Sequence, residues 1–120
     1  MQPFELIGAD GKRIKGDCAN GTVRQILFIT GFLSKRWGNK SKALAQWCQE
    51  KGWGFCCYDV RGFGDSEGQF TDYTLSDWIA DARTVVDSIK TGPSVTIVGN
   101  SLGSWIAWLV AQEFSVVEEL

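Results

Sequence analysis

The sequence of 120 residues contains no histidine. Histidine is the usual proton acceptor beside a serine nucleophile and a common zinc ligand. These residues therefore cannot by themselves form a Ser-His-acid triad or a mixed Cys/His zinc site. The sequence has four cysteines, whose spacing fits no metal site, so we predict reduced thiols, no metal and no cofactor. They are Cys18, Cys48, Cys56 and Cys57.

The sequence also lacks an excess of one charge and any long apolar run. The formal net charge is −2, and acidic and basic residues are interspersed. This pattern gives no electrostatic footprint for nucleic acid or an anionic membrane. No apolar run approaches the ~20 residues of a membrane-spanning helix, and the first residues show no secretory signal pattern. We therefore expect no nucleic-acid partner, no membrane span and a cytoplasmic location.

Apolar side chains make up 44% of the residues, including six Trp and seven Phe, as in a globular domain. The length fits a single domain, residues 1–120. Short apolar runs alternate with helical periodicity across short links, which predicts an α/β fold with a mostly parallel sheet and helices on both faces. The predicted strands are 4–7 and 13–15 (a hairpin around Asp10-Gly11), 25–30, 53–58 and 95–98. The predicted helices are 41–51 (N-cap Ser41, stop Gly52), 75–89 (stop 91–93) and 102–114.

The stretch Gly99-Asn100-Ser101-Leu102-Gly103 lies between the last predicted strand and the last predicted helix. A Gly-x-Ser-x-Gly turn in this context lifts the serine hydroxyl clear of the backbone. Gly99 and Gly103 would leave out side chains that collide in so sharp a turn. The N-terminus of the following helix would point its free N–H groups at whatever Ser101 attacks. Ser101 is therefore the candidate nucleophile.

A second glycine-containing loop, Asp59-Val60-Arg61-Gly62-Phe63-Gly64-Asp65-Ser66, follows an earlier predicted strand. A dinucleotide fingerprint needs Gly-x-Gly-x-x-Gly at the start of a helix. The spacing Gly62, Gly64, Gly68 differs from that fingerprint, and no helix follows directly. We therefore do not predict a nucleotide site here.

Together with Thr30-Gly31-Phe32, these motifs resemble the N-terminal half of an α/β-hydrolase. Within that superfamily the chain is most similar to ABHD10-type serine esterases and thioesterases and to serine aminopeptidase-like hydrolases. The resemblance implies that Ser101 is the nucleophile and that the backbone N–H groups of Phe32 and Leu102 are the oxyanion donors. It implies that Asp59 and Arg61 order their loop. Thr30 stands where many relatives have a structural histidine. No residue matches the triad acid or histidine, which follow the serine in that fold.

The function implied is hydrolysis of a small-molecule carboxylic ester or thioester through an acyl-enzyme on Ser101, incomplete here because the acid and histidine are missing. The alternative is a truncated, non-catalytic remnant or pseudoenzyme that binds a small acyl ligand or a partner chain. A lysine could replace the missing base, and Lys35 and Lys40 are placed for it, although solvated loop charges are the commoner role. The resemblance also leaves the strand 95–98 as an exposed edge, which predicts self-association through it.

Overall fold

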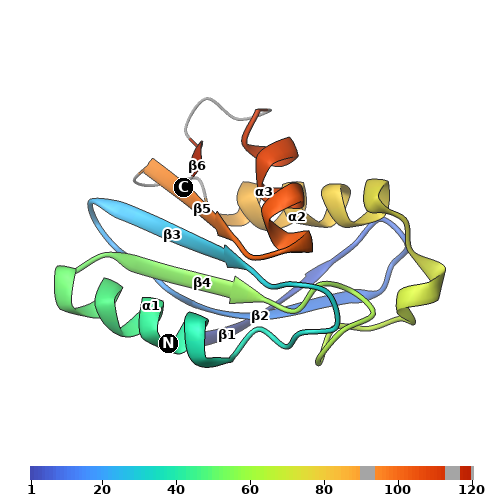
Figure 1. Ribbon diagram of the computed structural model, residues 1–120, viewed down its shortest axis with the longest axis horizontal. Coiled ribbons are helices and arrows are strands. Elements are labelled where there is room, and N and C mark those ends of the chain that lie inside the picture. Colours follow the sequence, from blue (N-terminus) through green and yellow to red (C-terminus); the bar gives the residue numbers. More distant parts are fainter. Residues whose placement is uncertain (90–93, 113–116, 120) are drawn as a thin grey trace.

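The computed structural model describes residues 1–89, 94–112 and 117–119, which form one sheet with helices on both faces (Figure 1). The sheet has six strands in the order β1-β2-β4-β3-β5-β6. The first two strands form an antiparallel hairpin, β2 runs antiparallel to β4, and the remaining pairs are parallel. The strands are β1 (Gln2–Ile7), β2 (Arg13–Ala19), β3 (Arg24–Ile29), β4 (Gly54–Tyr58), β5 (Ser94–Gly99) and β6 (Val117–Glu119).

Helix α1 (Asn39–Lys51) covers one face of the sheet, and α2 (Leu75–Ile89) and α3 (Leu102–Ala111) cover the other (Figure 1). Alternate residues of β3 serve the two layers, because side chains alternate along a strand. Ile26 and Phe28 belong to the core under α1, whereas Leu27 and Ile29 belong to the core under α2 and α3. The predicted fold class, a mostly parallel sheet covered on both faces with an N-terminal hairpin, is confirmed.

Most predicted elements are found, with shifted ends. Helix α1 begins at Asn39, so Gly38 and not Ser41 is its N-cap. The Ser41 hydroxyl instead accepts a hydrogen bond from the Gly38 N–H at 2.8 Å, from inside the first turn. Gly52 ends the helix with φ +73°, as predicted. The stop predicted at 91–93 and the helix end predicted at 114 lie outside the described residues.

The prediction of an exposed edge at residues 95–98 is wrong for most of its length. Strand β6 pairs in parallel with β5, from Val95 opposite Val117 to Ile97 opposite Glu119. The backbone groups that would have recruited another chain are therefore engaged within this chain. Self-association through Val95–Val98 stays an untested prediction.

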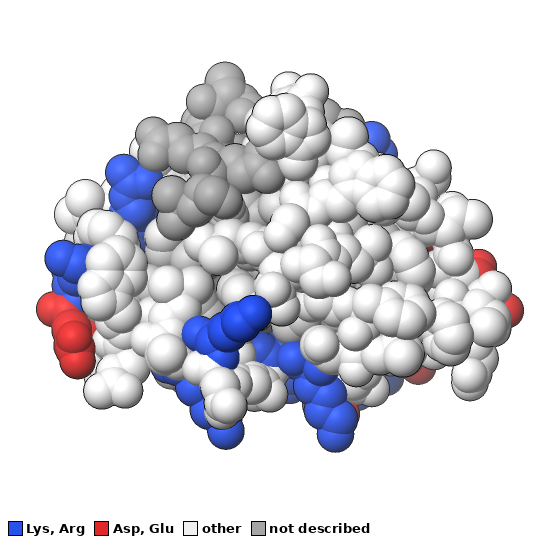
Figure 2. Space-filling model, viewed as in Figure 1, with Lys and Arg blue, Asp and Glu red and all other residues white. Residues whose placement is uncertain are grey.

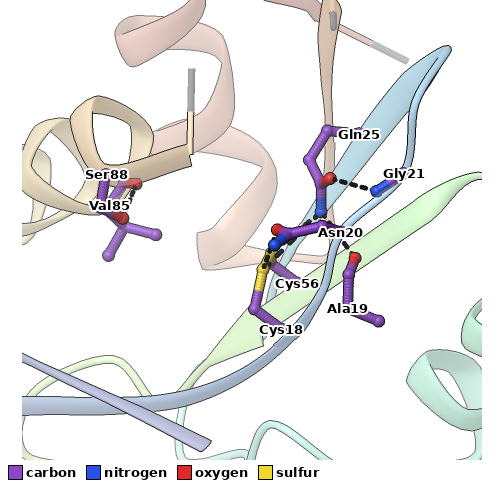
Figure 3. Close-up of a disulfide and its surroundings, with 8 residues drawn as sticks. All are labelled: Cys18, Ala19, Asn20, Gly21, Gln25, Cys56, Val85 and Ser88. Carbon is purple, nitrogen blue, oxygen red and sulfur yellow. Dashed lines mark hydrogen bonds between the residues drawn. A yellow bond between two sulfur atoms is a disulfide. The ribbon is translucent and has the colours of Figure 1, made fainter. Parts of the chain in front are cut away.

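The prediction of four reduced thiols is wrong for two of them. Cys18 on β2 and Cys56 on β4 are directly opposite each other in the antiparallel register and form a disulfide (Figure 3). The Gln25 amide lies beside it and donates to the Cys56 sulfur at 3.0 Å and to the Ala19 carbonyl at 3.1 Å. The prediction failed because it ended the second strand at residue 15, short of Cys18.

The other two cysteines, Cys48 and Cys57, are buried free thiols. Burial raises the pKa of both, that of Cys57 to about 12, so each behaves as a small apolar side chain. Among the described residues, no helix has the length and apolar character needed to cross a bilayer.

Candidate active site

The turn from β5 into α3 holds Ser101 in a backbone conformation that side chains rarely adopt, with φ +58° and ψ −120°. The side chain is exposed. Three backbone hydrogen bonds fix the turn: Asn100 N–H to Ile29 C=O at 3.2 Å, Gly103 N–H to Asn100 C=O at 3.0 Å, and Ser104 N–H to Ser101 C=O at 2.9 Å. One bond to β3 and two bonds within the turn into α3 therefore hold the strained backbone of Ser101 in place.

The two glycines of the motif are required by close packing. A Cβ on Gly99 would overlap the carbonyl of Gly103, and a Cβ on Gly103 would overlap the carbonyl oxygen of Ile29 at the end of β3. Both obstacles are backbone, which cannot move aside as a side chain can. The sequence-based reason for Gly99 and Gly103 therefore agrees with the contacts seen in the turn.

The end of β3 packs directly against this turn. A Cβ built on Gly31 would lie 3.2 Å from the Ser101 Cβ and 3.2 Å from the Asn100 carbonyl oxygen. Phe32 follows Gly31, and Leu102 is the first residue of α3. Within the described part of the chain, neither the Phe32 N–H nor the Leu102 N–H donates to a turn, loop or cap acceptor. Two backbone donors are thus available in the segments flanking Ser101.

The loop Asp59–Ser66 braces the segment that follows Phe32. The buried Asp59 carboxylate accepts hydrogen bonds from the Arg36 N–H at 2.6 Å, from the Asp65 N–H at 2.9 Å and from the Arg36 guanidinium. The Ser66 hydroxyl donates to the Asp59 carbonyl at 2.6 Å and accepts from the Lys15 N–H at 2.9 Å. Each of these polar groups has a partner inside the protein, which suits a structural loop.

These motifs are those of a known family. A family model described as "Serine aminopeptidase, S33" matches residues 22–116. The chain belongs to this family of α/β-hydrolases. Solved structures agree: a putative hydrolase from Agrobacterium vitis S4 superposes with a TM-score of 0.88 at 25% identity, over 98% of this chain and 49% of that one. The α/β-hydrolase domain-containing protein 10 from mouse superposes with a TM-score of 0.86 at 25% identity, over 98% and 47%.

The chain is also similar in sequence to the palmitoyl-protein thioesterase ABHD10 of mouse mitochondria, with 35% identity over 102 residues, 85% of this chain and 32% of that protein. For the human protein of the same name the identity is 34% over 95 residues, 79% of this chain and 29% of that protein. The chain thus spans about a third of the length of these curated relatives. The predicted resemblance to an α/β-hydrolase is confirmed.

Outside the turn Gly99–Gly103, which we call the elbow, Arg61 forms an ion cluster with Asp81 and Asp10. Its guanidinium donates to both carboxylate oxygens of Asp81, at 2.6 and 2.7 Å, and to Asp10. Burial raises the pKa of Asp81 to about 6, although the hydrogen bonds from Arg61 act to lower it. The Trp78 indole donates to the Arg61 carbonyl at 3.0 Å. These contacts anchor α2 to the loop, in keeping with the ordering role expected for Arg61.

The two lysines considered as replacement bases lie near the elbow on one side. Lys35 and Lys40 both line a hollow of about 260 Å³ together with Thr30, Gly31 and Asn100. Lys40 Nζ donates to Asn100 Oδ1 at 3.1 Å, next to Ser101 in sequence. Among the described contacts, neither lysine is hydrogen-bonded to the Ser101 hydroxyl. Lys40 therefore reaches the elbow, but it is hydrogen-bonded to Asn100 there.

Two further features beside the elbow depend on contacts between distant segments. Thr30 is buried, and its hydroxyl has no hydrogen-bond partner among the described residues. Three phenylalanine rings, of Phe32, Phe63 and Phe70, contact one another. Phe32 and Phe63 belong to the sequence motifs and contact each other, and the 3₁₀ helix η1 (Phe70–Asp72) adds the third ring.

Proposed function

We propose that this chain carries the nucleophile and the oxyanion donors of a serine hydrolase that acts on a carboxylic ester or thioester. The observation that carries the proposal is the backbone of Ser101, held at φ +58° between a strand and a helix N-terminus. A non-glycine residue is kept in such a conformation only where surrounding structure over-determines it, and such residues cluster at active sites. The thioesterase name of the relatives from mouse and human supports the substrate class.

In the proposed reaction the Ser101 Oγ attacks the substrate carbonyl carbon and gives its proton to a base. The carbonyl oxygen becomes an oxyanion that accepts hydrogen bonds from the Phe32 and Leu102 N–H groups. Collapse of this intermediate breaks the bond to the alcohol or thiol, which leaves with the proton. Water then attacks the acyl-enzyme and releases the carboxylic acid.

The scheme needs a base to accept the Ser101 proton. These 120 residues cannot supply an imidazole for it, because they contain no histidine. A serine hydroxyl is a weak nucleophile without a proton acceptor. Without added base we therefore expect slow acylation of Ser101, helped only by the oxyanion donors and by the strained turn.

Added imidazole provides a direct test, because it can accept the Ser101 proton from solution. The protein is treated with an alkyl fluorophosphonate at increasing imidazole concentration, and the adduct on each serine is quantified by peptide mass spectrometry. We expect imidazole to accelerate adduct formation at Ser101 on the order of a hundredfold more than at the other serines, from the contribution of oxyanion donors.

Ser104 supplies the matched control. It is also exposed and lies three residues further along, within the helix α3. Its hydroxyl donates to the Gly99 carbonyl at 2.8 Å. Ser101→Ala should abolish the imidazole-dependent adduct, and Ser104→Ala should leave it unchanged. Equal labelling of all exposed serines would contradict the proposal and favour a non-catalytic acyl-binding protein.

A further inference from the structure

The hollow beside the elbow collects positive charge and hydrogen-bond donors. It measures about 260 Å³ and lies between the end of β3, the connection that follows and the start of α1. Lys35 and Lys40 both line it, and none of the described residues around it is acidic. Its volume is slightly below the range usual for drug-sized ligands. A hollow of this size and charge suits a small anion or the anionic group of a larger molecule.

Helix α1 begins at the rim of this hollow. Its first two residues, Asn39 and Lys40, are among the lining residues. In the described turns, loops and caps, neither of their backbone N–H groups has an acceptor in the protein. The first turn also contains no acidic side chain. Unbonded N–H groups at the positive end of a helix dipole attract an anion.

Thr30 gives a second observation that is independent of the helix. The residue is only 2% exposed, and its hydroxyl has no hydrogen-bond partner in the described part of the chain. Thr30 lines the hollow together with Phe28, which packs in the core under α1. A buried hydroxyl without a partner costs free energy. An oxygen atom of a ligand in the hollow would supply the missing partner.

The positive charge at the hollow is not neutralised within the protein. Lys40 Nζ donates to Asn100 Oδ1 at 3.1 Å, which is a neutral partner. The neighbouring Arg36, in contrast, is bound to the carboxylates of Asp17 and Asp59. Figure 2 shows the same pattern on one face: basic side chains gather below the middle of the view, near the start of α1, and most acidic ones lie at the left and right ends.

We propose that this hollow binds phosphate, as the phosphoryl group of a monoester or as the free ion. The charges of Lys35 and Lys40 balance a phosphate dianion, and its oxygens are acceptors for the ammonium groups, the helix N–H groups and the Thr30 hydroxyl. The inference goes beyond the proposed hydrolase function and does not depend on it, because Ser101 and the two oxyanion donors do not line the hollow.

The test is a titration of the ¹⁵N-labelled protein with sodium phosphate, with sodium chloride at equal ionic strength as the baseline. We expect the amide signals of Asn39 and Lys40 to shift and to saturate in the millimolar range with phosphate and not with chloride. A parallel titration with ethyl phosphate separates the two sources. Similar shifts identify the phosphoryl group of a monoester as the ligand, and shifts with inorganic phosphate alone identify the free ion. If neither compound shifts these signals beyond chloride, the proposal is overturned.

Lys40→Gln tests the charge, because glutamine is neutral and keeps an N–H donor for Asn100 Oδ1. The variant should bind phosphate about fivefold more weakly. Lys42→Gln is the matched control: Lys42 lies in the same turn of α1 but lines a different cavity, beside Trp37 and Trp53. It should leave the affinity unchanged. Equal losses in the two variants would reflect the general charge of the helix and would contradict a site in the hollow.

Thr30→Val tests the buried hydroxyl, because valine keeps the shape and removes the donor. We expect phosphate affinity to fall about threefold. Urea unfolding without phosphate should show no loss of stability, since the hydroxyl bonds no described group of the protein. This pair of readouts separates a ligand contact from a structural role. Unchanged phosphate affinity in Thr30→Val would place the ion elsewhere and overturn the proposal, whatever the outcome of labelling at Ser101.

Discussion

The loop Asp59–Ser66 and the turn Gly99–Gly103 both follow buried parallel strands, yet they are built in opposite ways. In the loop, the Asp59 carboxylate and the Ser66 hydroxyl are buried and hydrogen-bonded inside the protein. In the turn, the Ser101 side chain is exposed, and its backbone is strained. At the same edge of the sheet, one loop therefore has its polar side chains hydrogen-bonded inside the protein, whereas the other leaves the Ser101 hydroxyl exposed.

This difference separates support from chemistry. A polar group that is fully bonded inside the protein stabilises the fold but has nothing left to offer a substrate. A strained, exposed serine costs stability and is retained where it does something else. The comparison predicts that Asp59→Ala in the loop will lower the free energy of unfolding, whereas Ser101→Gly in the turn will raise it.

The largest effect is expected from Asp59→Ala. The substitution removes the acceptor of two backbone N–H groups, on Arg36 and Asp65, and one partner of the Arg36 guanidinium. Buried donors left without partners and a weakened partly buried ion cluster should cost about 3 kcal/mol of the free energy of unfolding. Urea unfolding monitored by tryptophan fluorescence measures it.

Asp65→Asn is the control for this experiment, because Asp65 contacts the same Arg36 at 3.2 Å but has a side chain that is 72% exposed. An exposed pair of this kind contributes little, so the loss should stay under about 0.5 kcal/mol. Equal losses in the two variants would mean that the Asp59 loop is not the support described above.

A smaller effect of opposite sign is expected from Ser101→Gly. Glycine tolerates φ +58° without a Cβ clash, so the strain of about 1–3 kcal/mol is released. The greater flexibility of glycine in the unfolded chain takes back about 0.5–1 kcal/mol. The net result should be a gain of about 1 kcal/mol in unfolding free energy with loss of all imidazole-dependent labelling. Ser104→Gly, in regular helix, should instead lose up to about 1 kcal/mol.

The sequence was sufficient for features that depend on local pattern. The period of α2, the turn Gly99–Gly103 between a strand and a helix, and the Gly52 helix stop are written in short stretches, and the structure has all three at the predicted positions. The start of α1 was missed because a good N-cap residue, Ser41, lies three residues inside the helix and serves Gly38 from there. The predicted N-cap is therefore wrong: Ser41 accepts from the N–H that precedes the helix and caps none that follows it.

Features that join distant segments could not be read from the sequence. The Cys18–Cys56 disulfide depends on the register between β2 and β4 across 38 residues. The contacts among the Phe32, Phe63 and Phe70 rings depend on two distant connections meeting, the one after β3 and the one between β4 and α2. The pairing of β6 with β5 depends on a return of the chain after α3. None of these has a local signal, because register and loop packing are set by the whole sheet.

The smallest predicted effect is a pH dependence of the unfolding free energy that comes from Asp17. Burial would raise the pKa of Asp17, but hydrogen bonds from Arg36 at 2.8 Å and the Trp37 indole at 2.7 Å outweigh it and hold the pKa below the ordinary 3.8. A carboxyl with a lowered folded-state pKa contributes stability that is complete above its unfolded value and is lost as pH falls through its folded value.

The unfolding free energies of wild type and Asp17→Asn should therefore differ most near neutral pH and converge below about pH 4. A gap that stays constant across this range would show that the Asp17 charge does not support the Arg36 segment. Since Ser101 does not titrate in this range, the stability gain of Ser101→Gly should be the same at both ends of it.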